Sequence, residues 1–224
     1  LSGGAAPLYN LDDSTYVLEL WHGPTSAFKD MALQIMPRLL SRALKMTDET
    51  RTAHILVATS GDTGKAALEG FKDVNGTRIL VFFPNDGVSP MQKLQMTTQV
   101  GNNVGVSAIY GNFDDAQTGV KKIFTDPAIR ETLAEKGFAF SSANSINWGR
   151  LAPQIVYYIS AYCDLLKKGE IANGEAINIV VPTGNFGNIL AAYYAKKMGL
   201  PVKKLICASK SSMYIGIPFI TCST

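Results

Sequence analysis

The sequence has few of the residues that mark a metalloprotein, a disulfide scaffold or a membrane protein. Among its 224 residues are three cysteines, Cys163, Cys207 and Cys222, whose odd number and wide spacing fit neither a disulfide framework nor a zinc site. The two histidines, His22 and His54, are too few for a histidine-rich metal centre. No apolar run approaches the length of a membrane span, and no signal-peptide pattern is present. We therefore expect a globular, cytoplasmic protein with no membrane partner and no metal.

The charge of the chain is also modest. The formal net charge is +3, and the lysines and arginines are scattered along the sequence instead of forming a basic stripe. A nucleic-acid partner is therefore not expected, although the isoelectric point is near 8.7. Hydrophobic residues make up 46% of the chain and charged residues 17%, which is an ordinary globular composition with enough apolar residues for one large or two small domains.

From Ala53 onward, short apolar runs alternate with amphipathic stretches. The expected strands cover residues 53–60, 78–83, 104–110, 138–143, 177–182 and 203–209. The expected helices cover residues 64–74, 89–101, 114–124, 127–137, 151–168 and 189–200, with Ser89 as the N-cap of the second. This alternation predicts an α/β fold with mostly parallel sheets and helices on both faces. Ligands of such sheets bind where strands lead into helices, so these turns are the places to search for a site.

The first unusual turn is ATSGDTGKAA, residues 58–67, between an expected strand and an expected helix. Small residues with hydroxyl groups at a helix N-terminus expose backbone N–H groups and the positive end of the helix dipole, which together bind anions. The turn is not a nucleotide P-loop, because Thr59 replaces the first glycine of that motif and Ala66 replaces its Ser or Thr. The alternative is an ordinary helix cap with turn glycines.

The second unusual turn is VVPTGNFGNIL, residues 180–190. Gly184 and Gly187 allow the backbone to approach a ligand closely, and successive N–H groups can form an anion-binding nest. The turn lacks the dinucleotide fingerprint G-x-G-x-x-G, so a single phosphate group fits better than a pyrophosphate. A plain left-handed turn is the alternative.

The third turn, SSANSINWGR at residues 141–150, is polar. Asn144 and Asn147 can form fixed hydrogen bonds, and Arg150 offers a two-pronged donor for a carboxylate or a phosphate. A separate feature is Lys29, which stands at the edge of an apolar helical pattern. A surface lysine whose stem covers apolar neighbours is the simple explanation of Lys29.

Two anion sites, a polar loop with an arginine and a lysine at a helix start together fit a phosphorylated aldehyde cofactor. A lysine amine forms a Schiff base with such a cofactor, a helix N-terminus holds its phosphate, and a second anion site takes the carboxylate of an amino acid. Lys29 would then also serve as the general base at the substrate α-carbon. These features predict pyridoxal phosphate chemistry on an amino acid without specifying which one.

Four motifs in order, HGPTSAFKD, ATSGDTG, NSINWGR and PTGNFGN, resemble the threonine synthase family of fold-type-II (tryptophan synthase β-like) pyridoxal phosphate enzymes, over residues 18–209. The resemblance implies that Lys29 is the catalytic residue and binds the cofactor covalently. The cofactor phosphate site that it implies consists of Gly184, Asn185, Phe186, Gly187 and Asn188. The substrate site that it implies consists of Ser60, Gly61, Asp62, Thr63, Gly64, Asn144, Ser145, Asn147 and Arg150, with Arg150 as a candidate ligand of the substrate phosphate. The implied reaction converts O-phospho-L-homoserine and water to L-threonine and phosphate.

The resemblance also implies a division into domains. A smaller α/β domain would cover residues 30–143, and residues 1–29 with 144–209 would belong to the larger, phosphate-binding domain, while the tail 210–224 does not match the family. Family members are longer at both ends, so we expect a fragment that lacks part of the active-site wall, which argues against activity of this chain alone. The alternatives are another pyridoxal phosphate lyase or phospho-lyase of amino acids, and a truncated, non-catalytic binding or signalling product.

Overall fold

The computed structural model describes residues 4–145, 147–182 and 185–208. The chain divides into two compact units, which we call unit 1 (Leu1–Glu19 and Leu151–Thr224) and unit 2 (Leu20–Arg150). Both contain parallel strands and helices, so the expected α/β class is confirmed. The tail 210–224 lies outside the described residues.

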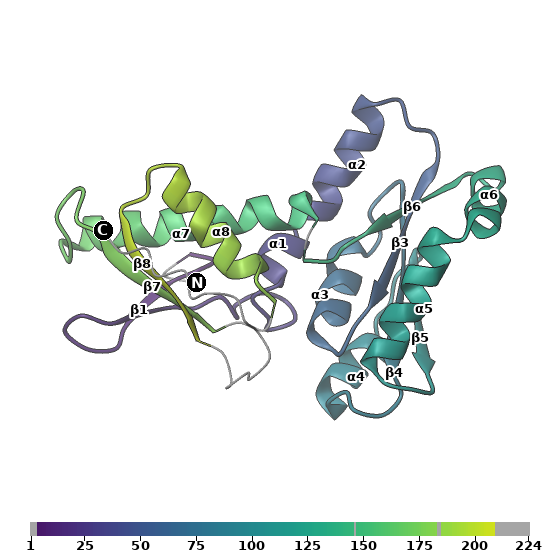
Figure 1. The fold of residues 1–224 in the computed structure, drawn as a ribbon, viewed down its shortest axis with the longest axis horizontal. Helices are drawn as coiled ribbons and strands as arrows, with labels where there is room; N and C mark the ends of the chain where they lie inside the picture. Colours follow the sequence, from purple (N-terminus) through teal and green to yellow (C-terminus); the bar gives the residue numbers. More distant parts are fainter. Residues whose placement is uncertain (1–3, 146, 183–184, 209–224) are drawn as a thin grey trace. The chain divides into compact units, whose positions relative to one another are not determined.

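Unit 2 is built on a four-stranded sheet with the order β5-β4-β3-β6 (Figure 1). The strands are β3 (Thr52–Ala58), β4 (Thr77–Pro84), β5 (Val104–Ile109) and β6 (Phe138–Ser142). All neighbouring pairs are parallel, and Ile55 in the central strand β3 stands opposite Ile79 of β4 and Ser141 of β6. The carboxyl ends of the strands therefore share one edge, where the SGDTG turn follows β3.

Six helices are described in unit 2. They are α1 (Asp30–Leu33), α2 (Met36–Met46), α3 (Asp62–Phe71), α4 (Pro90–Thr97), α5 (Phe113–Thr125) and α6 (Pro127–Glu135). The predicted cap of α4 is confirmed, because the Ser89 hydroxyl accepts a hydrogen bond from the Gln92 backbone N–H at 3.3 Å. The helix α5 begins with a capping box of Asn112 and Asp115.

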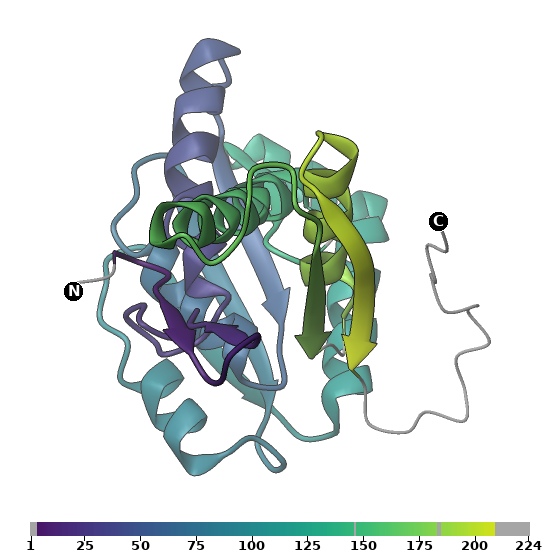
Figure 2. The same cartoon turned by 90° about the vertical axis from the view of Figure 1, so that its left-hand side faces the viewer.

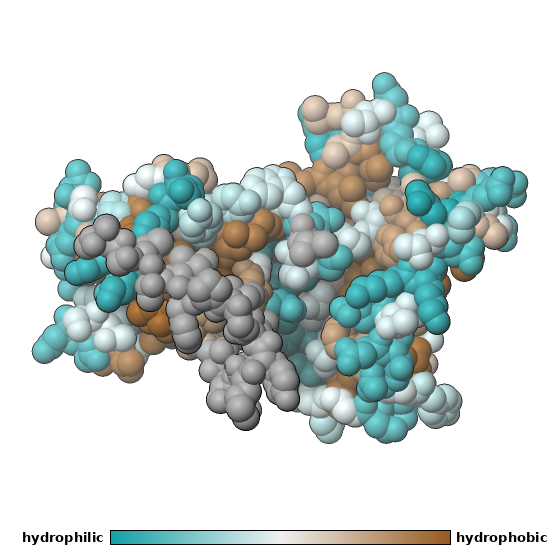
Figure 3. All heavy atoms as spheres, viewed as in Figure 1, coloured by the Kyte–Doolittle hydropathy of each residue, from teal (hydrophilic) through white to brown (hydrophobic). Residues whose placement is uncertain are grey.

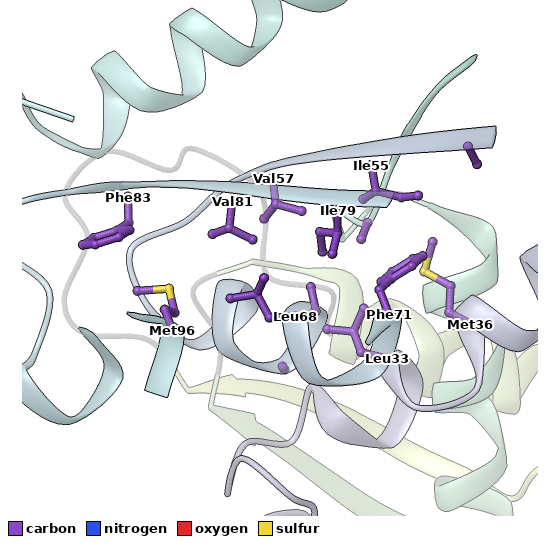
Figure 4. Close-up of a cluster of buried hydrophobic side chains, with 14 residues drawn as sticks. Leu33, Met36, Ile55, Val57, Leu68, Phe71, Ile79, Val81, Phe83 and Met96 are labelled. Atoms are coloured by element: carbon purple, nitrogen blue, oxygen red, sulfur yellow. The ribbon is translucent and has the colours of Figure 1, made fainter. Parts of the chain in front are cut away.

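The core of unit 2 lies between the sheet and α3 (Figure 4). Alternate residues of β3, among them Ile55 and Val57, meet Leu68 and Phe71 of α3, and all four are buried. Each large apolar side chain that is fully buried in this way contributes roughly 1.5–3 kcal/mol to folding. The opposite sheet face carries His54, whose ring lies 6.4 Å from that of Phe140.

The apolar pattern that follows Lys29 forms two helices, α1 and α2, separated at residues 34–35. The short α1 packs directly on α3, because Gly70 has no side chain to keep the Leu33 carbonyl away. This close approach groups α1 with unit 2, and the sequence-based division also placed α1 in its smaller domain, residues 30–143. That division assigned residues 1–29 and 144–209 to the other domain. In the contact-based division, residues 20–29 and 144–150 group with unit 2, and the functional domain boundaries stay a prediction.

Unit 1 contains an antiparallel hairpin and a parallel pair of strands. The hairpin joins β1 (Leu8–Asn10) to β2 (Tyr16–Leu18), and it was not anticipated from the sequence. The long helix α7 (Trp148–Lys168) belongs to this unit from Leu151 onward and precedes β7 (Ile177–Pro182), α8 (Gly187–Lys197) and β8 (Val202–Ala208). Figure 2 shows β7 and β8 running in the same direction, in agreement with their parallel register.

The surface of unit 2 is mixed in character. Figure 3 shows mainly hydrophilic side chains over α5 and α6 and hydrophobic ones near α2, where Ile35, Leu39 and Met46 are exposed. Within residues 4–145, 147–182 and 185–208, no helix combines the length and apolar character needed to cross a membrane. The same described part of the chain contains no cluster of three or more His, Cys, Asp or Glu that could hold a metal ion.

Candidate active site

Lys29 stands immediately before α1, in a turn that is held closed by its neighbour Asp30. The Asp30 carboxylate is 1% exposed and accepts hydrogen bonds from Thr25 N–H at 2.9 Å, the Thr25 hydroxyl at 2.7 Å and Ala27 N–H at 3.3 Å. These bonds tie the segment before Lys29 to the residue that follows it. The sequence analysis missed Asp30, because an acidic residue in the first turn of a helix is too common to indicate such a role.

The Lys29 side chain is 17% exposed, and its Nζ lies 3.6 Å from Asp62 Oδ2. Burial lowers the pKa of the Lys29 amine, the charge of Asp62 opposes that effect, and the positive charge of Arg150 lowers the pKa again. The net result is a pKa below the usual lysine value. A larger fraction of this amine is therefore neutral and nucleophilic near pH 7 than of an exposed lysine.

The SGDTG turn is organised by Thr59, which precedes it. The Thr59 hydroxyl oxygen accepts hydrogen bonds from Gly61 N–H at 2.9 Å and Gly64 N–H at 3.0 Å, so the turn closes on a buried side chain. Gly61 has a φ angle of 142°, and a Cβ atom there would collide with the Gln92 side chain. Glycine is thus required both by the backbone angle and by the close approach of α4.

Asp62 begins α3 and binds three side chains. Its Oδ1 accepts a hydrogen bond from Gln92 Nε2 at 2.8 Å and lies 3.2 Å from Lys65 Nζ, while Oδ2 faces Lys29. Burial raises the pKa of the Asp62 carboxyl, but the charge of Lys29 and the hydrogen bonds from Lys65 and Gln92 outweigh it, so the pKa lies below its usual value. Of the rest of the predicted turn, Ser60 is exposed, Thr63 is half-buried and Gly64 is buried.

The polar loop 141–150 uses much of its hydrogen-bonding capacity internally. Asn147 Nδ2 donates to the Ser142 carbonyl at 2.8 Å, and Asn147 Oδ1 accepts from Gly149 N–H at 2.9 Å. Arg150 is 5% exposed and donates from Nη1 to the Ala143 carbonyl at 3.0 Å. Asn144 is exposed and Ser145 is half-buried. Unit 2 thus brings Asp62 and Arg150 within electrostatic reach of Lys29.

The predicted cofactor-phosphate loop lies in unit 1. Gly184 falls outside the described residues, Asn185 and Phe186 are exposed, and Gly187 begins α8. Within the described part of the chain, no side-chain hydrogen bond caps the start of α8, and a helix N-terminus of this kind favours an anion.

Asn188, in the first turn of α8, is held from α7. Its Oδ1 accepts hydrogen bonds from the Tyr157 and Tyr158 hydroxyl groups, each at 2.5 Å. Burial raises the pKa of the Tyr158 phenol, which keeps it protonated and able to donate. Because both phenols approach the oxygen, the amide nitrogen on the opposite side of the group is turned away from them.

Gln92, Lys65 and the two tyrosines were not identified from the sequence. Gln92 lies thirty positions after Asp62, and no local pattern indicates that their side chains meet. Lys65 is part of the predicted turn region, but its burial could not be inferred from a position that follows a glycine. The tyrosines belong to an apolar helical face, where core packing is the ordinary role of an aromatic residue.

Known proteins resemble this chain over most of its length. The family model for pyridoxal-phosphate dependent enzymes matches residues 3–218, which extends into the segment that begins at residue 210. Threonine synthase-like 1 of Homo sapiens is 46% identical over 213 residues, which are 92% of this chain and 28% of that protein. The threonine synthase of Schizosaccharomyces pombe is 43% identical over 212 residues, which are 92% of this chain and 40% of that protein.

A solved structure also resembles this chain. The pyridoxal-phosphate-bound threonine synthase of Brucella melitensis superimposes with a TM-score of 0.80 and 46% identity, covering 91% of this chain and 41% of that one. The chain therefore spans less than half the length of these three relatives. The predicted fold-type-II architecture is confirmed, and with it the expected cofactor class. This chain belongs to the family of pyridoxal-phosphate dependent enzymes.

Proposed function

We propose that the protein to which this chain belongs is a threonine synthase, a carbon–oxygen lyase that converts O-phospho-L-homoserine and water to L-threonine and phosphate. The names of the relatives from S. pombe and B. melitensis support this substrate class. The observation that carries the proposal is the half-buried Lys29 amine, with a lowered pKa and a carboxylate 3.6 Å away, in a turn fixed by Asp30. We place the reaction in the cytoplasm, which the unpaired Cys163 and Cys207 support.

The residues present fit pyridoxal phosphate. Its aldehyde needs a neutral lysine amine, which the lowered pKa of Lys29 supplies. Its phosphate needs several donors, and the first turn of α8, at Gly187 and Asn188, has N–H groups that no described side chain caps. When bound, pyridoxal phosphate supplies the electron sink that stabilises negative charge on the substrate α-carbon.

Lys29 has two tasks in this proposal. Its neutral amine would hold the cofactor aldehyde in the absence of substrate, and with substrate bound Lys29 Nζ would take the proton from the substrate α-carbon. The turn around Asp30 keeps the amine in place for both tasks, because the backbone N–H groups of Thr25 and Ala27, which precede Lys29, are bonded to the side chain of Asp30, which follows it.

Anion recognition is divided between two other elements. The turn from Ser60 to Gly64 would bind the substrate carboxylate at the start of α3 through the backbone N–H groups that do not donate to Thr59, since those of Gly61 and Gly64 do. The Asp62 side chain itself carries a negative charge and cannot bind a carboxylate. Arg150 would attract the substrate phosphate, which would leave when its bond to the γ-carbon breaks, after the β-carbon has lost a proton. The γ-carbon would then gain a proton, and water would add at the β-carbon afterwards. Asn144, Ser145 and Asn147 would shape the loop that carries Arg150.

The test is turnover with defined products. The full-length product of the gene, and this chain separately, would be incubated with pyridoxal phosphate and O-phospho-L-homoserine, and threonine and inorganic phosphate would be measured. We expect equimolar threonine and phosphate from the full-length protein and none from its Lys29→Ala variant. If the full-length protein binds the cofactor but forms no threonine, the proposal is wrong, and activity on phosphoserine or serine would then identify another lyase.

A further inference from the structure

The Asp62 carboxylate is anchored at one oxygen and presents the other to Lys29. Gln92 Nε2 and Lys65 Nζ both lie at Oδ1, at 2.8 and 3.2 Å, whereas Lys29 Nζ lies 3.6 Å from Oδ2. The anchor comes from two helices, α3 and α4, that are packed together in the core of unit 2. The position of Oδ2 is therefore set by partners other than Lys29.

Lys65 is an unusual residue in this cluster, because its side chain is 8% exposed and carries an ammonium group. A buried charge is strongly unfavourable unless it is paired, and the ion-pair partner of Lys65 is Asp62. Lys65 therefore cannot leave Asp62 without a large free-energy cost. Asp62, whose side chain is 41% exposed, is tied by Lys65 to the protein interior while one of its oxygens stays available.

The charges of the cluster explain why this arrangement suits an anion-binding turn. A carboxylate at the start of α3 would repel an anionic substrate if it stood alone. With Lys29 and Lys65 on either side, the three groups carry a net positive charge when Lys29 is protonated and are neutral overall when it is not. The turn can thus hold an acidic residue next to the lysine without excluding a negatively charged substrate.

We propose that Asp62 is the electrostatic partner of the free Lys29 amine, and that Lys65 and Gln92 are positioning residues that hold its carboxylate at the required distance. This inference rests on the proposed function for the role of Lys29 as a base. When Lys29 Nζ has taken the proton from the substrate carbon, its positive charge is stabilised by Asp62 Oδ2. Lys65 draws the negative charge of Asp62 toward Oδ1 and so weakens the stabilisation of the Lys29 ammonium by Oδ2. Lys29 can therefore release the proton again.

The charged groups that act on Lys29 come from two elements. Asp62 and Lys65 belong to α3, and Arg150 belongs to the start of α7. Asp62 favours the protonated amine, whereas Lys65 and Arg150 favour the neutral one. Removing Asp62 or Lys65 must therefore move the protonation of Lys29 in opposite directions, which a purely structural role for the cluster does not require.

The experiment measures Lys29 directly and needs neither cofactor nor substrate. The chain without cofactor is labelled with trace acetic anhydride over a series of pH values, and the Lys29 peptide is quantified by mass spectrometry. The variants are Asp62→Asn and Lys65→Met, with Lys72→Met as the control, since Lys72 is an exposed lysine at the other end of α3. Circular dichroism and melting curves establish that each variant is folded, and Lys65→Gln replaces Lys65→Met if the latter is not.

At pH 7 we expect Asp62→Asn to raise the labelling rate of Lys29 roughly three- to tenfold and Lys65→Met to lower it, with no change in Lys72→Met. The high-pH plateau of each profile separates protonation from reagent access. An unchanged profile in Asp62→Asn, or a shift of both variants in the same direction, would overturn the inference. Because the readout is independent of turnover, the expected shifts without threonine formation would refute the proposed substrate and leave the pairing intact.

Discussion

The Asp30 carboxylate accepts two hydrogen bonds from Thr25, one from the backbone N–H at 2.9 Å and one from the hydroxyl at 2.7 Å. Lys29 lies between these two residues in the sequence, so its backbone is part of the ring that they close. The pair is buried, with Thr25 at 6% and Asp30 at 1% exposure. The geometry of the lysine thus depends on a residue that has no chemical part in the proposed reaction.

The first prediction concerns this pair. Asp30→Ala is expected to lower the free energy of unfolding by about 2–3 kcal/mol, because it leaves two backbone donors and a hydroxyl without their acceptor in a buried site. Thr25→Val removes one donor and keeps the volume, so about 1 kcal/mol is expected. Urea unfolding measures both, with the exposed Glu131→Ala as the control. Equal effects of Asp30→Ala and Glu131→Ala would contradict this role of Asp30.

The second prediction separates backbone strain from steric conflict at Gly61. Gly61→Ala is expected to cost about 1–3 kcal/mol of stability, since alanine is strained at a φ of 142° and its Cβ would meet Gln92. The double variant Gly61→Ala/Gln92→Ala should recover only part of the loss, because removing Gln92 relieves the collision but not the strain. Gly119→Ala, in open space within α5, serves as the control and should be neutral or stabilising. Full recovery in the double variant would show that the backbone angle is unimportant.

How far the sequence predicts this molecule depends on whether a feature is local. The strands, the cap Ser89 and the SGDTG turn follow from apolar runs and turn residues that are adjacent in sequence. The Gln92–Asp62 hydrogen bond does not, because it depends on the packing of α4 against α3. The hairpin of β1 and β2 was missed since each strand has only three residues, none of them buried, which is too few to show alternation.

Arg150 illustrates a second limit of prediction from the sequence, which concerns burial. Its sequence context indicated a donor for a carboxylate or a phosphate but did not indicate its burial, and the structure places it at 5% exposure, with Nη1 donating to the Ala143 carbonyl. Burial of an arginine depends on the whole fold around it, which a single sequence does not reveal. The charge of Arg150 still lowers the pKa of Lys29, so Arg150 acts electrostatically on the proposed catalytic lysine.

The third prediction addresses Asn188, whose Oδ1 is shared by two phenols. Tyr157→Phe and Tyr158→Phe should each lower the free energy of unfolding by about 1 kcal/mol or less, since the other hydroxyl still satisfies the oxygen. The double variant should cost more than the sum of the single ones, because Asn188 Oδ1 then loses both donors. Tyr110→Phe, at a side chain that is 97% exposed, is the control. Strict additivity would mean that the phenols do not act on a common acceptor.

The fourth prediction is the pH dependence of cofactor capture by Lys29. Burial lowers the pKa of this amine, so its neutral form is present at a lower pH than that of an exposed lysine, whose pKa is about 10.4. On addition of pyridoxal phosphate, the visible absorbance band of the lysine-bound cofactor should therefore form at a rate that rises with pH and levels off below that value. Lys29→Ala should abolish the band at neutral pH, and Lys72→Ala should retain it. A rate that keeps rising to pH 10 and above, or a band that persists in Lys29→Ala, would indicate capture by an exposed lysine and remove Lys29 from the cofactor site.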